Sequence, residues 1–188
     1  VLLKGGFDVV LWEINEEALE KALASIRKTF DYPIKQKKMT PADLENLLNN
    51  HLQTTTSLED MKDVDLVIEA VVEDMQVKQE IWQQLQGICR DDVIFATNTS
   101  ALPITEMASI LNNPGRMIGM HFFNPVPKMK LVEIIRGLET SEETFRTVVD
   151  AAVEMGKETV DIKESPGFVT SRINVVIGNE AFYMLQEG

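Results

Sequence analysis

Apolar residues along the chain follow two spacings, one typical of strands and one typical of helices. Short apolar runs rich in β-branched residues predict strands over 7–13, 64–74, 93–100, 116–122, 130–137 and 158–163. Apolar residues three or four positions apart predict helices over 15–30, 40–51, 75–89, 102–111 and 141–157, and a last helix from 165. Because strands and helices mostly alternate, we predict an α/β fold with a mostly parallel sheet and helices on both of its faces.

The last predicted helix has no partner strand. Ser165 is its predicted N-cap, Pro166 lies in its first turn, and an apolar pattern continues to the end of the chain. We therefore predict an α/β domain over 1–164 and the first helix of a separate all-helical domain over 165–188. The opening "VLLKGG" is typical of the end of a helix that glycine stops, so we expect the chain to be a fragment that lacks material at both ends.

Composition and charge exclude several classes of protein. The formal net charge of −12 argues against nucleic acid as a partner, because a phosphate-binding surface requires clustered Lys and Arg. The single cysteine, Cys89, cannot form an internal disulfide, which is typical of a reducing compartment and predicts a cytoplasmic location. No apolar run approaches the roughly 18 residues that span a bilayer, so no membrane partner is expected. No metal site is predicted.

Glu13 ends the first predicted strand. In a Rossmann-like unit, an acid at the end of the second strand binds the ribose hydroxyls of NAD and repels the 2′-phosphate of NADP. A solvated surface charge is the other interpretation of Glu13. The glycine-rich phosphate loop of such a unit is absent from the sequence. We therefore expect the 1–164 domain to lack its first strand and that loop, and to bind the dinucleotide poorly as it stands.

Polar residues lie at or near the ends of three successive predicted strands: "NTS" at 98–100, His121 in "HFFNP", and Glu133 in "LVEII". In open α/β sheets, ligands bind outside the carboxyl ends of the strands. His121 and Glu133 lie on neighbouring predicted strands, so their side chains can meet. A carboxylate bound to one imidazole nitrogen stabilises the cation that forms when the other nitrogen takes a proton. The pair predicts a hydroxyl-oxidising dehydrogenase, whereas His121 alone could be a structural strand-end histidine.

Four longer segments point to a known family. "DLVIEAVVEDMQVKQEIW", "FATNTSALPI", "GMHFFNPVPKMKLVEII" and "SPGFVTSRI" resemble, in order and spacing, the L-3-hydroxyacyl-CoA dehydrogenases, which include the dehydrogenase part of multifunctional fatty-acid oxidation proteins. The resemblance covers nearly the whole chain. It implies a Rossmann-like NAD-binding domain followed by a helical dimerisation domain, and reversible NAD-dependent oxidation of an L-3-hydroxyacyl-CoA to a 3-oxoacyl-CoA. The implied partners are the acyl-CoA and a second copy of the chain, or a multifunctional complex.

The same resemblance implies roles for individual residues. His121 matches the catalytic base, Glu133 its orienting partner and Ser100 the serine that binds the substrate oxygen. The implied cofactor contacts are Glu13, Glu73, Lys78, Ser100 and Asn124, and the implied substrate contacts are Ser25, Lys78, Ser100 and Ser171. The basic run at 35–38, Lys128 and Lys130 are either contacts for CoA phosphates or solvated charges. Ser171 stands where the family usually has Asn, so its shorter side chain reaches the substrate only through water, if at all.

Two other functions remain open. A catalytically incompetent fragment, or a domain of this fold kept for structure or assembly, is favoured by the expected missing ends and by Ser171. A hydroxy-acid dehydrogenase on a similar fold usually relies on a lysine or on a differently placed histidine, so the "HFFNP" motif argues against it.

Overall fold

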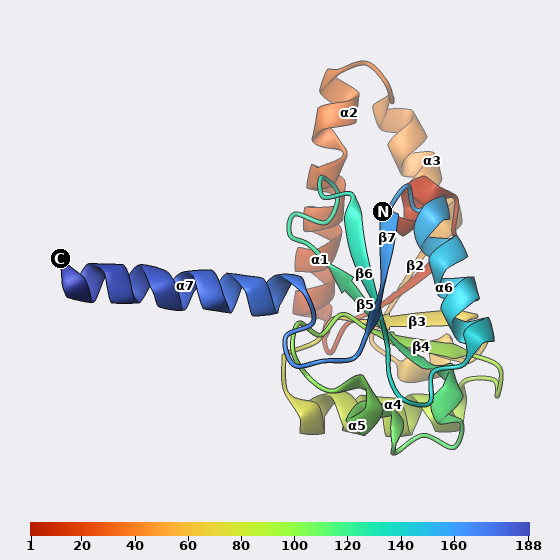
Figure 1. Cartoon of the computed structure of the whole chain (residues 1–188). Helices are drawn as coiled ribbons and strands as arrows, with labels where there is room; N and C mark the ends of the chain where they lie inside the picture. The colour runs from red at the N-terminus through yellow and green to blue at the C-terminus, as the bar shows by residue number, and fades with distance from the viewer.

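The computed structural model describes all residues from Val1 to Gly188 as an α/β unit from which one long helix projects (Figure 1). The strands are β1 (Val9–Trp12), β2 (Leu52–Thr55), β3 (Leu66–Glu69), β4 (Ile94–Thr97), β5 (Met117–Phe122), β6 (Leu131–Arg136) and β7 (Glu158–Lys163). The helices are α1 (Glu16–Thr29), α2 (Asp31–Lys35), α3 (Pro41–His51), α4 (Met75–Ile88), α5 (Ile104–Ala108), α6 (Glu142–Glu154) and α7 (Thr170–Glu187). Short 3-10 turns are η1 (Leu2–Gly5), η2 (Leu58–Met61) and η3 (Pro114–Arg116).

The strands form two sheets. One pairs β1 with β2, and the other has the order β3-β4-β5-β6-β7. All neighbours are parallel except β5 and β6, which confirms the predicted mostly parallel sheet. β2 is not predicted from the sequence, because "LQTT" is polar and only Thr55 is buried. Its pairing with β1 is a long-range contact that local pattern does not reveal.

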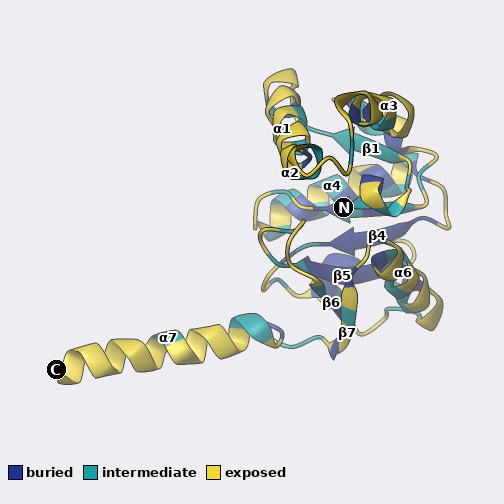
Figure 2. Cartoon of the chain, turned by 90° about the horizontal axis from the view of Figure 1, so that it is seen from above, coloured by how far each residue is buried: buried dark blue, intermediate teal, exposed yellow.

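Side chains of the five-stranded sheet alternate between its two faces, as the pleat requires. On one face, Phe95, Met117 and Ile135 pack with Trp82 of α4 and Met107 of α5. On the other face, side chains of β4, β5 and β6 pack against α6; they include Ile94, Ile118, Met120, Val132 and Ile134. Helices therefore cover both faces, as predicted, and the central strands are the most deeply buried part of the chain (Figure 2).

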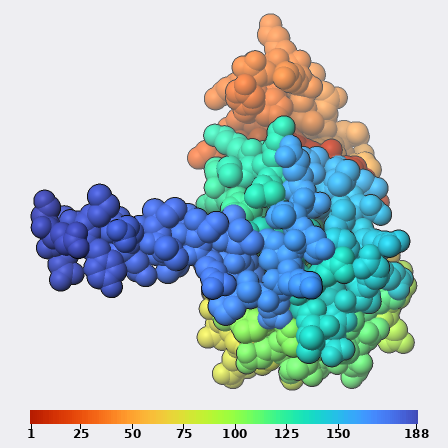
Figure 3. Space-filling view, viewed as in Figure 1, coloured from red at the N-terminus to blue at the C-terminus, as the bar shows by residue number.

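Helices α1, α2 and α3 form a projection at one end of the molecule (Figure 3). The Asn15 side chain caps α1 by accepting from the backbone N–H of Ala18. Thr40 and Asp43 form a reciprocal capping box at the start of α3. A small core between α1, α3 and η1 holds the projection in place; it contains Leu3, Phe30, Leu44 and Leu48.

Two predicted boundaries differ most from the structure. The last helix begins at Thr170 rather than at 165, because Gly167 and Phe168 have φ values of 72° and 52°, in the left-handed region that interrupts a right-handed helix. Phe168 accepts this conformation while its side chain is buried in the core. β3 ends at Glu69 rather than continuing to 74, because the Glu69 carboxylate accepts from the N–H of Val71 and turns the chain. No helix combines the length and apolar character needed to cross a membrane.

Candidate functional site

His121 and Glu133 face each other across the only antiparallel strand pair of the sheet. The register of β5 and β6 places them directly opposite, and such residues project their side chains from the same face. His121 Nδ1 lies 2.7 Å from Glu133 Oε2. Both residues are buried, with exposed fractions of 7% and 0%. Because an ionised carboxylate only accepts hydrogen bonds, this geometry favours the neutral tautomer with the proton on Nδ1 and the lone pair on Nε2. The predicted juxtaposition is confirmed.

Ser100 lies on the open side of the imidazole. Its Oγ is 3.2 Å from His121 Nε2, and Ser100 itself is exposed. The two residues meet because β4 and β5 are parallel, so that the turn after β4 lies beside the end of β5. The rings of Phe123 and Phe168 flank the imidazole, with centroids 4.9 and 5.9 Å from it. One nitrogen of His121 is thus held by the protein, and the other can accept a proton from a hydroxyl placed beside Ser100.

Glu73 fixes the turn that carries Ser100. Its Oε1 accepts from the N–H of Ser100 at 2.8 Å and from the hydroxyl of Thr99 at 2.5 Å. Partial burial acts to raise the pKa of Glu73, but the hydrogen bonds from Thr99 and Ser100 and the charge of Lys78 outweigh it and hold that pKa below its usual value. Glu73 is therefore ionised at neutral pH, and its carboxylate positions Ser100 through the backbone.

Lys78 lies under this turn and not at its surface. Its Nζ is 2.6 Å from Glu69 Oε1 and 3.4 Å from Glu73 Oε2, and the residue is 1% exposed. Glu69 also accepts from the hydroxyl of Thr97 at 2.7 Å. The ammonium is therefore paired with two carboxylates, and through Glu73 it supports the turn that carries Ser100. Its contacts with cofactor and substrate stay a prediction.

Glu69 and Lys157 support the site and are not predicted from the sequence. A carboxylate inside the apolar run "LVIEA" is the signal that could have identified Glu69, since it must find a partner when buried. Lys157 donates from Nζ to the carbonyls of Val126 and Met129, at 2.5 and 2.7 Å, in the loop that follows β5. Desolvation lowers the pKa of Lys157. The role of Lys157 was hard to predict from the sequence, because a lysine near the end of a helix is usually solvated.

The remaining predicted site residues lie on other elements than the His121–Glu133 pair. Asn124 is exposed in the loop after β5, and Glu13 follows β1 with its N–H bound to Thr55 and its carboxylate without a partner in the chain. Ser171 is half-buried in the first turn of α7. Ser25 is exposed on α1, and the basic run at 35–38 is exposed at the tip of the projection. Neither Ser25 nor the basic run contacts His121.

Lys128 and Lys130 are exposed in the loop between β5 and β6. Lys130 Nζ lies 3.8 Å from Glu158 Oε1, in an ion pair that solvent screens strongly. The contact of these lysines with CoA phosphates stays a prediction. No group of three or more His, Cys, Asp or Glu side chains is arranged to hold a metal ion.

Comparison with known proteins places this geometry in context. Residues 1–165 match the family described as "3-hydroxyacyl-CoA dehydrogenase, NAD binding domain". The chain is 45% identical over 183 residues to 3-hydroxybutyryl-CoA dehydrogenase of Clostridioides difficile, covering 97% of this chain and 65% of that protein. It is 40% identical over 176 residues to the fatty acid oxidation complex subunit alpha of Shewanella oneidensis, covering 94% of this chain and 25% of that protein.

A solved structure shows the same fold. The crystal structure of (S)-3-hydroxybutyryl-CoA dehydrogenase from Ralstonia eutropha superposes with a TM-score of 0.94 at 42% identity, covering 99% of this chain and 65% of that one. The chain thus spans about two thirds of the length of its curated 3-hydroxybutyryl-CoA dehydrogenase relatives and about a quarter of the oxidation-complex subunits.

Proposed function

Because this chain belongs to the 3-hydroxyacyl-CoA dehydrogenase family as its NAD-binding domain, we propose that the complete gene product oxidises an L-3-hydroxyacyl-CoA to the 3-oxoacyl-CoA with NAD, reversibly. The observation that carries the proposal is the hydrogen-bonded line from Glu133 through His121 to Ser100. In this line the Nδ1 side of the base is bound to the Glu133 carboxylate, and its Nε2 faces the hydroxyl of Ser100. The substrate class comes from the family and from the names of the relatives.

The mechanism follows from the atoms of the line. The hydroxyl of Ser100 donates a hydrogen bond to the 3-hydroxyl oxygen, and His121 Nε2 takes the proton of that 3-hydroxyl. As that O–H bond breaks, the C3–O bond becomes a carbonyl and the hydrogen on C3 departs with its electron pair. NAD, when bound, accepts that hydride. The carboxylate of Glu133 balances the charge of the imidazolium, and because both residues are shielded from water this stabilisation is stronger than it would be at a surface.

The test is an assay of the complete gene product. We expect NADH to form from 3-hydroxybutyryl-CoA and NAD, and to be consumed with the 3-oxoacyl-CoA. Free 3-hydroxybutyrate is the matched control, because it contains the same hydroxyl without CoA and would be the better substrate of a hydroxy-acid dehydrogenase. No turnover with any 3-hydroxyacyl-CoA, at several chain lengths, would refute the proposal and favour a structural or assembly role.

The cofactor site is proposed to include Glu13. Its free carboxylate at the end of β1 fits the ribose hydroxyls of NAD.

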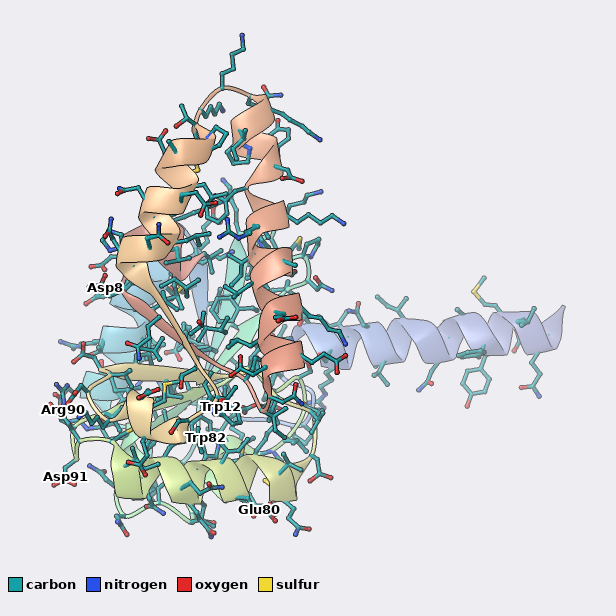
Figure 4. The ribbon with its side chains drawn as sticks, turned by 180° about the vertical axis from the view of Figure 1, so that it is seen from behind. Asp8, Trp12, Glu80, Trp82, Arg90 and Asp91 are labelled. Carbon is teal, nitrogen blue, oxygen red and sulfur yellow. The ribbon has the colours of Figure 1, made fainter.

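β1 and β3 each have one unpaired edge. Trp12 of β1 packs against the core that contains Trp82 of α4 (Figure 4), and both indole N–H groups are buried without a partner. We propose that a further strand, followed by a phosphate-binding loop, completes the sheet between β1 and β3 in the complete gene product.

Replacing Glu13 by Ser in the complete gene product should lower the preference for NAD over NADP. The change removes an acceptor for the ribose hydroxyls and a charge that repels the 2′-phosphate, so we expect the ratio of kcat/KM values to fall about tenfold or more. Glu17→Ser, at an exposed position on α1, is the control and should leave the ratio unchanged. An unchanged ratio for Glu13→Ser would show that this residue does not bind the ribose.

The exposed apolar side chains of α7 support the proposal that a second copy of the chain or further helices cover it. None of its residues is buried, and it stands clear of the sheet (Figure 2). Its exposed large apolar side chains are Ile173, Val175, Val176, Ile177, Phe182, Tyr183, Met184 and Leu185.

Cys89 is a free buried thiol, which supports the proposed cytoplasmic location.

Light scattering of the complete gene product should give the mass of a homodimer. Ile177→Asp places a charge in the apolar surface of α7, so we expect it to raise the dimer dissociation constant about 100-fold or more. Glu180→Gln, on the same helix, should leave that constant unchanged. A monomeric wild-type protein would contradict the dimer, and a larger mass with other subunits in the purified material would indicate a multifunctional complex.

A further inference from the structure

The carboxylate of Glu133 has a second partner besides His121. Thr170 donates its backbone N–H to Glu133 Oε1 at 3.1 Å and its hydroxyl to Glu133 Oε2 at 3.1 Å. Oε2 is also the atom that binds His121 Nδ1 at 2.7 Å. Glu133 is fully buried, so these protein groups replace the water that an ionised carboxylate would otherwise bind. Thr170 therefore supplies two of the three hydrogen bonds that the Glu133 carboxylate accepts.

Thr170 can do this because of the turn that precedes it. It is the first residue of α7, and its N–H is among those of the first helical turn that find no partner inside the helix. The N-terminal end of a helix also carries partial positive charge, which favours a nearby carboxylate. The left-handed residues Gly167 and Phe168 direct the chain so that Phe168 packs beside the imidazole and Thr170 faces the carboxylate.

We propose that Thr170 is a positioning residue for the reaction: through Glu133, the first turn of α7 holds the His121 imidazole at the angle at which Nε2 faces Ser100. This inference rests on the proposed function. Without the hydroxyl of Thr170, Glu133 keeps the backbone N–H on Oε1 but loses the donor on the oxygen that orients the imidazole. The carboxylate can then rotate, and the His121 ring with it.

The test compares Thr170→Val with Thr170→Ser in the complete gene product. Val matches the shape of Thr without a donor, whereas Ser keeps the donor. We expect Thr170→Val to lower kcat about tenfold with KM for NAD and acyl-CoA unchanged. We expect Thr170→Ser to stay within about twofold of wild type. A structural role alone would lower the melting temperature of both enzyme variants without this selective loss of kcat.

A second measurement does not depend on activity. Selective ¹⁵N labelling of histidine, with the His121 signal assigned from its loss in His121→Gln, reports which ring nitrogen carries the proton. We expect Nδ1 to be protonated in the neutral wild-type ring and a mixture of both tautomers in Thr170→Val. An unchanged tautomer together with an unchanged kcat would overturn the inference. If no 3-hydroxyacyl-CoA is turned over by the wild type, the proposed function fails, and the ¹⁵N spectrum alone decides the role of Thr170.

Discussion

Replacing His121 by Gln in the complete gene product is expected to lower kcat for NADH formation about 10²- to 10⁴-fold. Gln occupies a similar volume and can still bind a hydroxyl, but it cannot take a proton at neutral pH. Substrate binding at Ser100 does not require that proton transfer, so KM for the acyl-CoA should change little. Steady-state rates with 3-hydroxybutyryl-CoA give both constants.

His51 provides the matched control for this experiment. It is the other histidine of the chain, exposed at the end of α3, and its Nδ1 lies 2.7 Å from Asp8 Oδ1. The same His→Gln change at position 51 should leave kcat within about twofold of the wild-type value, because no contact links it to the His121–Glu133 pair. Near-normal turnover by His121→Gln would end the assignment of His121 as the base.

Lys78→Met is expected to have the largest effect on stability. Met keeps much of the volume of Lys, but Glu69 would then be a buried carboxylate without its counter-ion. Loss of one partner of a buried ion pair typically costs about 3–5 kcal/mol of unfolding free energy. Glu73 would also lose a charge that helps hold it under Ser100, so kcat should fall as well. Urea unfolding followed by circular dichroism measures the first effect.

Two further variants separate the buried pair from ordinary ion pairs. Lys21→Met removes the exposed pair of Lys21 with Glu17, whose side chains are 73% and 77% exposed, and should cost at most about 1 kcal/mol. Adding Glu69→Gln to Lys78→Met removes the uncompensated charge and should recover part of the loss, because the Gln oxygen still accepts from the N–H of Val71 and its NH2 group can donate to the hydroxyl oxygen of Thr97. A cost for Lys78→Met no larger than that for Lys21→Met would show that the pair is not buried in solution.

Much of the candidate site could be predicted from local sequence. Strand side chains alternate with a period of two, and β5 and β6 follow each other in the chain, joined by residues 123–130. Pairing of these two strands therefore brings His121 and Glu133 to the same face of the sheet. Ser100 followed from the rule that parallel strands end at one edge of a sheet. The roles of Asn124, Ser25 and Ser171 came from the family resemblance, and that of Glu13 came also from its place at the end of a strand. All four stay predictions.

The sequence by itself determined every strand except β2, every helix except α2, the mostly parallel sheet and the pairing of His121 with Glu133. Each of these depends on the spacing of residues within one segment or on the order of successive segments. Only the tertiary structure decided that Lys78 is enclosed by Glu69 and Glu73, that β2 pairs with β1, and that α7 begins at Thr170 against Glu133. These depend on contacts between segments far apart in the chain. There, the cost of leaving a buried charge or hydrogen-bonding group without a partner outweighs local preference.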